Sequence, residues 1–339
     1  MMVAGAVETH VFTLTLPREV TGQTLVFWSG GHRWIKLEIP MQNAQPMGEG
    51  YVSARIFGGP ELKPVPRPPP SKMQELMRVA FEIPGGSIPA GARLKITLGD
   101  SSLGSPGARS PRFSAAGVFL ALTSEPRPAD LPQHDPNWVG AFPIDIIGGP
   151  LDHIRVRAPS TVRKGEKFSL TIRPQDNYGN TSPQVPNRVV VHLPGKTREH
   201  RITPNRLNRV GVVELSGFKL AGNDVARIVV QDPDTGVTAR SNPILIQGPA
   251  RGLFWGVIHE HTELSDGLGS VDRCYYNMRY GSRLDFGAVS DHDHRFETSD
   301  AMWEMAKEAA VRHHESGAFV TFLGYEWAKW RQNGDGDRN

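Results

Sequence analysis

The chain has only one cysteine, Cys274, among its 339 residues. A single cysteine cannot form an intrachain disulfide, and it excludes a zinc site built mainly from thiolates. The first eleven residues have no basic segment and no long apolar run, and Glu8 interrupts them. We therefore expect neither a signal peptide nor a transmembrane helix, and we predict a cytoplasmic protein.

The sequence also lacks a heptad run and any clear internal repeat. An apolar content of 38% and a charged content of 22% are typical of an ordinary soluble globular protein. The length predicts two or three domains. Glycine (36 residues) and proline (28 residues) are abundant, which favours many turns and short strands.

The net charge of +3 conceals an asymmetry between the two parts of the chain. Residues 250–339 hold 10 Lys and Arg against 15 Asp and Glu, together with six of the twelve histidines. This part would repel a phosphate backbone, so its composition favours cation binding over nucleic-acid binding. We expect neither a nucleic acid nor a membrane as a partner.

Residues 1–148 show the alternation of apolar and polar residues that predicts β-strands. The predicted strands are Val11–Leu16, Trp34–Ile39, Val79–Ile83 and Leu94–Leu98. Gly and Pro clusters mark turns between the last two strands. The expected fold is a first all-β sandwich domain.

Residues 149–248 carry about seven further short apolar runs, which fit an immunoglobulin-like β-sandwich. The sequence does not state the role of the two sandwiches, and carbohydrate or protein contacts are the partners we expect for them. The boundary to a third part, residues 249–339, is marked by Gly248-Pro249-Ala250.

Residues 249–339 alternate strand-like and helix-like patterns. Apolar runs at Leu253–Ile258, Phe286–Val289 and Phe319–Leu323 predict strands, and helices are expected after Ser270 and after Ser299, both good N-caps. This order predicts βαβ units with parallel strands, whose carboxyl ends lie at one edge of the sheet.

Metal-ligating residue types follow each predicted strand. His259 and His261 are two apart, so on an extended chain both imidazoles can face one ion. Asp266 lies in the glycine-rich loop that follows, and Asp291, His292, Asp293 and His294 follow the second strand. Glu326 follows the third strand and can bridge two ions. A mixed set of imidazoles and carboxylates suits Zn²⁺, Mn²⁺ or Fe²⁺.

At these motifs the sequence resembles the polymerase-and-histidinol-phosphatase (PHP) superfamily, whose members are metal-dependent phosphoesterases built on a distorted (β/α)₇ barrel. The resemblance rests on Gly256–Thr262, Ser265-Asp266-Gly267 and Asp285–Asp293. A branch in which a PHP-like domain follows β-sandwich domains is also similar at Phe322–Trp327 and at Gly336–Asn339. That branch is further similar in the second sandwich, at Ala158-Pro159-Ser160, Gly165-Glu166 and Asp176–Asn180.

The resemblance implies that His259, His261, Asp266, His292 and Glu326 are ligands of a centre of two or three metal ions. We add Asp291 as a sixth predicted ligand, and we assign Asp293 and His294 to proton transfer. The implied reaction is hydrolysis of a small-molecule or polymeric phosphoester by metal-activated water. About ninety residues hold only the first units of such a barrel, so we expect a fragment with an incomplete, impaired site.

Two alternative functions remain open. An amidohydrolase-type metal hydrolase also places His-x-His after its first barrel strand, although the Ser265-Asp266-Gly267 motif favours the PHP-like prediction. A non-catalytic protein that binds carbohydrate or a protein partner through its sandwiches is the alternative from another class.

Overall fold

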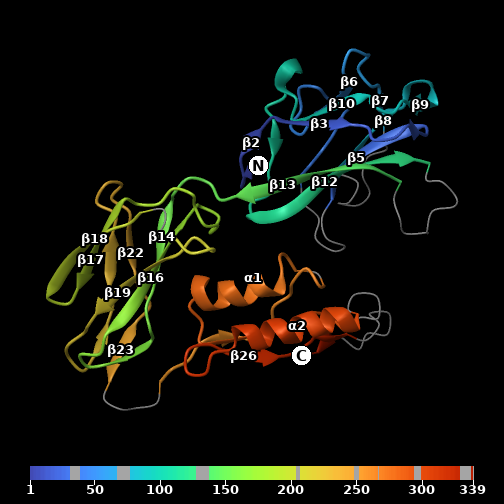
Figure 1. The fold of residues 1–339 in the computed structure, drawn as a ribbon. Coiled ribbons are helices and arrows are strands. Elements are labelled where there is room, and N and C mark those ends of the chain that lie inside the picture. The colour runs from blue at the N-terminus through green and yellow to red at the C-terminus, as the bar shows by residue number, and fades with distance from the viewer. Residues whose placement is uncertain are drawn as a thin grey trace. The chain divides into compact units, whose positions relative to one another are not determined.

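The computed structural model describes residues 1–30, 39–66, 77–126, 137–203, 207–247, 252–265, 267–293, 299–328 and 337–338. The described chain is mostly β-strand, arranged in several sheets with few helices (Figure 1). It divides into two compact units, Met1–Ile147 and Gly148–Asn339. This division falls beside the boundary predicted at residue 148, whereas the boundary predicted at residue 248 lies outside the described residues.

The first unit is a β-sandwich of two main sheets with one apolar core between them. The larger sheet has the order β1 (Met2–Val3), β13 (Trp138–Ile147), β12 (Ala115–Glu125), β5 (Thr24–Gly30), β8 (Arg78–Glu82) and β7 (Pro64–Val65). The smaller sheet has the order β3 (His10–Thr15), β10 (Arg93–Leu98) and β6 (Val52–Ile56). Buried side chains from both sheets, such as Phe27 and Ile96, belong to one cluster.

Three of the four strands predicted in this unit are present within one residue at each end, as β3, β8 and β10. The last two lie in different sheets, and a 3₁₀ turn at Pro84–Gly86 and the short β9 (Ser87–Ile88) separate them. The predicted strand Trp34–Ile39 falls almost wholly outside the described residues. Short pairs, β2 (Val7–Glu8) with β11 (Ala108–Arg109) and β4 (Val20–Thr21) with β9, complete the unit.

The second unit begins with the predicted second sandwich, whose strands lie in three small sheets around one core. The first sheet is β14 (His153–Arg157), β16 (Phe168–Gln175) and β19 (Val213–Phe218). The second is β18 (Lys196–Arg201), β17 (Arg188–Leu193), β21 (Val229–Gln231) and β22 (Thr238–Arg240). The third is β15 (Thr161–Arg163), β23 (Ile244–Gln247) and β20 (Val225–Ala226).

A buried carboxylate closes the turn that follows β16. Asp176 accepts hydrogen bonds from the backbone N–H groups of Gly149, Tyr178 and Asn180, and from the side-chain amide of Asn180. Burial opposes ionisation of Asp176, but these hydrogen bonds outweigh it and lower its pKa. The carboxylate therefore ties the start of the sandwich, at Gly149, to the turn at 176–180.

The last part of the second unit is a small parallel sheet with two helices. Its strands, β24 (Gly256–Val257), β25 (Phe286–Val289) and β26 (Val320–Leu323), are parallel and adjacent in chain order, as the sequence predicts. Helix α1 (Val271–Tyr276) continues into a π-helical turn at Asn277–Gly281, and α2 spans Asp300–His313. Three parallel strands do not distinguish the start of a barrel from an open sheet.

Both helices begin at the predicted caps. The hydroxyl of Ser270 accepts a hydrogen bond from the backbone N–H of Arg273, and that of Ser299 accepts one from Met302. The helices contact each other and the strands of the sheet (Figure 1). Their buried side chains, including Tyr275, form one apolar cluster with Phe319. None of the helices that the structure describes is long and apolar enough to cross a membrane.

Tyr275 connects helix α1 to the ends of strands β25 and β26. It is 1% exposed, its hydroxyl donates to the carbonyl of Phe322 in β26, and it accepts from the N–H of Val289 in β25. Burial raises the pKa of Tyr275, so the hydroxyl keeps its proton and can fill both roles at neutral pH. The carboxyl ends of β25 and β26 are thereby held together from one side.

Replacement of Asp176 by alanine is expected to destabilise the second sandwich by about 2–4 kcal/mol, because four donors lose a buried acceptor. In differential scanning calorimetry of the whole chain, the unfolding transition of this sandwich should move to a lower temperature than in the wild type. Asp152→Ala is the matched control, because Asp152 is exposed and, among the described residues, its carboxylate pairs only with the neighbouring His153. Equal effects of the two substitutions would contradict the assigned role of Asp176.

Candidate metal centre

Backbone pairing continues beyond the ends of β25 and β26 and places two of the predicted ligands side by side. His292 and Glu326 form a parallel bridge. The N–H of Glu326 donates to the carbonyl of Asp291, and the N–H of Asp293 donates to the carbonyl of Glu326. Paired positions on neighbouring strands project to the same face of a sheet, so the two side chains meet.

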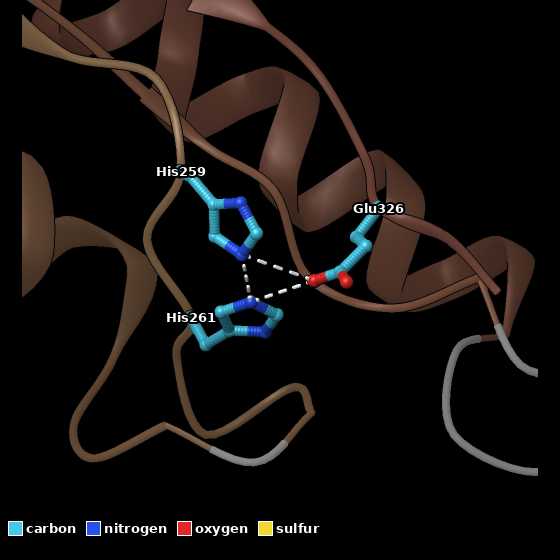
Figure 2. Close-up of side chains that lie close together, drawn as sticks. All are labelled: His259, His261 and Glu326. Carbon is cyan, nitrogen blue, oxygen red and sulfur yellow. Dashed lines mark hydrogen bonds and ion pairs between the residues drawn. The ribbon is translucent and has the colours of Figure 1, made fainter. Parts of the chain in front are cut away.

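Three imidazoles converge on one carboxylate oxygen at this edge. The Oε2 atom of Glu326 lies 2.8 Å from Nε2 of His261, 3.2 Å from Nε2 of His259 and 3.3 Å from Nε2 of His292. Figure 2 shows His259 and His261 turned toward Glu326 from the chain that follows β24. The two Nε2 atoms of His259 and His261 are 2.9 Å apart. These atoms come from all three strand ends.

The cluster fits a cation better than it fits a hydrogen-bond network. Glu326 is 6% exposed, and within the described chain its Oε2 forms no hydrogen bond of ordinary geometry, although three nitrogens surround it. His259, His261 and Glu326 each offer one ligand atom, all within 4.8 Å of one another. A tetrahedral zinc ion with bonds of about 2.0–2.2 Å keeps its ligands roughly 3.3 Å apart, close to the separations here. The residues present therefore fit a divalent metal ion.

Asp291, predicted as a ligand, has both carboxylate oxygens occupied by other donors. Its Oδ1 accepts from the N–H of Thr262 at 2.7 Å and from the hydroxyl of Ser265 at 2.6 Å. Its Oδ2 accepts from the hydroxyl of Thr262 at 2.7 Å. Asp291, Thr262 and Ser265 are all buried. This carboxylate holds the loop after His261 against the end of β25, and the structure supports a positioning role for it.

The same network selects the tautomer of His261. The hydroxyl of Ser265 uses its proton for Asp291, so it can accept a hydrogen bond from Nδ1 of His261, which lies 3.1 Å away. In the neutral imidazole, a proton on Nδ1 leaves the lone pair on Nε2, the atom that faces Glu326. Outer partners that orient a ligating imidazole in this way are typical of metal sites.

A glycine allows the loop to fold back onto the histidines. A Cβ on Gly267 would lie 2.0 Å from the carbonyl oxygen of His261 and 2.5 Å from the nitrogen of Thr262. The N–H of Gly267 instead donates to the carbonyl of Thr262 at 2.9 Å. Any larger side chain at position 267 would displace this loop.

The remaining predicted site residues are placed only in part. Asp266 and His294 lie outside the described residues, so their roles stay predictions. The backbone of Asp293 pairs with Glu326, and its side chain is exposed at the rim of the site.

A cavity of about 340 Å³ lies beside the cluster. Its walls include the metal-site residues Asp291, His292 and Asp293 and the aromatic residues Trp303 and Tyr325, whose rings meet edge to face at 5.9 Å. No role in the site was predicted from the sequence for Trp303, Tyr325, Thr262 or the hydroxyl of Ser265. For Tyr325 a signal existed, because it directly precedes the predicted ligand Glu326 at a strand end.

No protein-family model matches the chain. Similar curated proteins are uncharacterised: one from Chlamydia pneumoniae is 24% identical over 267 residues, covering 76% of this chain and 42% of that protein. One from Chlamydia muridarum is 26% identical over 259 residues, covering 74% of this chain and 41% of that protein. The chain thus spans about two-fifths of the length of these relatives.

Two solved structures show a faint likeness to the chain. The I9–I11 tandem of titin covers 77% of this chain and is itself covered to 68%, with a TM-score of 0.20 and 9% identity. A marsupial T cell receptor covers 73% of this chain and is covered to 76%, with a TM-score of 0.17 and 11% identity. These scores are too low to assign a fold.

Replacement of Asp291 by asparagine is expected to weaken metal binding by about 10–100-fold without abolishing it, because a positioning partner is lost and the ligands remain. Metal affinity measured by competition with a chromogenic chelator tests this. Asp272→Asn is the control, since Asp272 is an exposed carboxylate that pairs with Arg312 and His313. Complete loss of one metal equivalent in Asp291→Asn would instead show that Asp291 is a ligand.

Proposed function

We propose that the α/β segment is the metal-binding part of a hydrolase that cleaves phosphoesters. The observation that carries this proposal is the convergence of three imidazole nitrogens on the buried Oε2 of Glu326. The set of nitrogen and carboxylate ligands suits Zn²⁺, Mn²⁺ or Fe²⁺. Two or three ions are expected in the complete domain, by the resemblance of these motifs to the PHP superfamily.

His259, His261, His292 and Glu326 would hold the ions. Such an ion supplies a Lewis acid and activates water near neutral pH. Asp291 fixes the loop that carries His261, and Ser265 keeps the His261 lone pair directed at the cluster. These contacts hold the described residues of the cluster close together without an ion, which would lower the ordering cost of binding.

The neighbouring cavity offers room for the group that a phosphoester releases. Trp303 and Tyr325 give it an aromatic wall, and Asp293 lies at its boundary with the cluster. An exposed carboxylate at that boundary is suited to carry a proton to or from the reacting group. We assign this role to Asp293, and His294 is the second candidate from the sequence.

Metal analysis is the first test. After incubation with Zn²⁺ or Mn²⁺ and removal of free metal, the chain should retain about one equivalent or more, and the double variant His259→Ala/His261→Ala should retain none. At a free metal concentration 100 times the Kd, metal binding should stabilise the fold by about 2.7 kcal/mol. His153→Ala is the control, since His153 is an exposed imidazole of the sandwich. Equal metal retention in wild type and double variant would refute the centre.

Substrate classes separate the proposal from its alternatives. A metal-loaded longer protein that spans the full length of its relatives should hydrolyse 4-nitrophenyl phosphate or bis(4-nitrophenyl) phosphate, and the metal-loaded chain itself should do so more slowly or not at all. Glu326→Gln should lower that rate at least 100-fold, because it removes a charged ligand. Hydrolysis of amides or lactones alone would favour an amidohydrolase-type enzyme. Metal binding without any hydrolysis by the longer protein would favour a non-catalytic binding protein.

A further inference from the structure

A second hollow lies on the sandwich of the second unit, apart from the histidine cluster. It has a volume of about 630 Å³ and is bordered by β14 and β22. Each of these is the edge strand of its own sheet, and the two strands contact each other across the sandwich. Residues far apart in the sequence, 153–157 and 238–242, thus share one groove.

The groove is lined by positive charge. Arg155 and Arg157 come from β14, Arg240 from β22, and Arg227 from the chain before β21. None of the described residues that line it is Asp or Glu. Within the described chain, none of these four guanidinium groups lies within 4 Å of a carboxylate, in contrast to Arg188, which pairs with Asp234 at 2.8 Å.

The neutral polar residues of the groove are engaged elsewhere. The Oδ1 of Asn242 accepts a hydrogen bond from the N–H of Ala158, and the side-chain amide of Asn242 donates one to the carbonyl of Ala158. Ser241 donates to the carbonyl of Asn242 and accepts from Ile228, and Gln175 donates to the carbonyl of Gly179. The nearby Asp176 is buried and is held by its four donors. Thr238 donates to the carbonyl of Gly236, and His153 pairs with the carboxylate of Asp152. Arg227 donates to the carbonyl of Ser241, so the side chains left to contact a ligand are chiefly those of Arg155, Arg157 and Arg240.

The arginines also repel one another. Arg173 is the partner of Arg155 across β14 and β16, so a fifth guanidinium lies next to the groove. Burial, followed by the charge of Arg155, lowers the pKa of both Arg157 and Arg173. This repulsion is relieved when an anion enters, and the composition agrees: residues 149–248 hold 15 Lys and Arg against 8 Asp and Glu, a net charge of +7.

Charged side chains on edge strands also prevent sheets from joining edge to edge, and this is the simpler explanation of the cluster. Such protection needs charges spread along an edge. It does not need four guanidinium groups from two sheets around one hollow of ligand size. We propose that this groove binds a ligand that carries two or more phosphate groups, either free or as the headgroup of a lipid.

The lining favours such a ligand over single-stranded nucleic acid. No Phe, Tyr or Trp is among the described residues that line the groove, so bases have no aromatic surface on which to stack. Guanidinium forks match the geometry of phosphate oxygens. Arg155 and Arg157 are two residues apart on one strand, about 6.6 Å, so one ligand with neighbouring phosphates can reach both.

Isothermal titration calorimetry of the metal-free whole chain with inorganic tripolyphosphate tests the proposal. In 50 mM NaCl we expect saturable binding with one ligand per chain, weakened at least fivefold by 200 mM NaCl because salt screens the charges. The double variant Arg155→Gln/Arg240→Gln should bind at least 20-fold more weakly. Arg155→Lys/Arg240→Lys, which keeps the charge, should lose less.

Two controls make the result specific. Arg188→Gln removes a paired arginine of the same sandwich and should change the affinity by less than twofold. His259→Ala/His261→Ala should also retain the affinity, which separates this groove from phosphate bound at the metal centre. Calorimetric melting temperatures of all variants establish that each is folded.

The source of the phosphates is resolved by two further probes. Binding to vesicles with 5% phosphatidylinositol 4,5-bisphosphate, but not to vesicles with the same charge from phosphatidylserine, supports the lipid source. Binding of free inositol trisphosphate with similar affinity supports the soluble source. Absence of saturable tripolyphosphate binding, or an unchanged affinity in Arg155→Gln/Arg240→Gln, overturns the proposal. The proposal is also overturned if duplex RNA binds through the same arginines at least tenfold more tightly than tripolyphosphate.

Discussion

Backbone pairing past the ends of β25 and β26 is the constraint on which the histidine cluster depends. The bridge between His292 and Glu326 fixes their register, and Tyr275 holds both strand ends from the helical side. His259 and His261 reach the same point from a loop, and loops need separate support. The carboxylate of Asp291 gives that support through Thr262 and Ser265. Loss of either constraint would separate the imidazoles from Glu326.

A bound cation would explain why the carboxylate of Glu326 is buried among imidazoles at the end of the sheet. A buried carboxylate without hydrogen bonds of good geometry is costly, and so are imidazole nitrogens that face one another. A divalent cation would relieve that cost, because the carboxylate and the imidazole lone pairs could all bind it. In the neutral ring, the hydrogen bond from Nδ1 of His261 to Ser265 leaves the lone pair on Nε2, which suits a cation.

The sequence predicted those features that depend on local order. Strand runs followed by histidines and carboxylates, with serine caps before two helices, are enough to predict parallel strands and a common edge. Local patterns do not reveal which side chain contacts which. Asp291 and His292 are equally plausible as ligands in the sequence, yet only the imidazole faces Glu326, because neighbouring residues on an extended chain point in opposite directions. Thr262 and Ser265 belong to motifs that carry the resemblance, but no local pattern predicts that their hydroxyls donate to Asp291, since hydroxyl residues are common in loops.

The arginine groove could not be predicted from the sequence for a related reason. Arg155 and Arg240 are separated by most of a domain, and each alone is an ordinary charged residue on a strand. They come together only because the edges of two sheets lie next to each other. In the same way, the histidines meet Glu326 only because three strand ends lie side by side.

The two sites have opposite charge, which bears on how an anionic ligand would be handled. The acidic segment repels phosphate until cations neutralise its carboxylates, whereas the arginine groove attracts phosphate with no metal present. Phosphate should therefore bind the sandwich independently of metal and bind the cluster only after metal. That order follows from the charges alone.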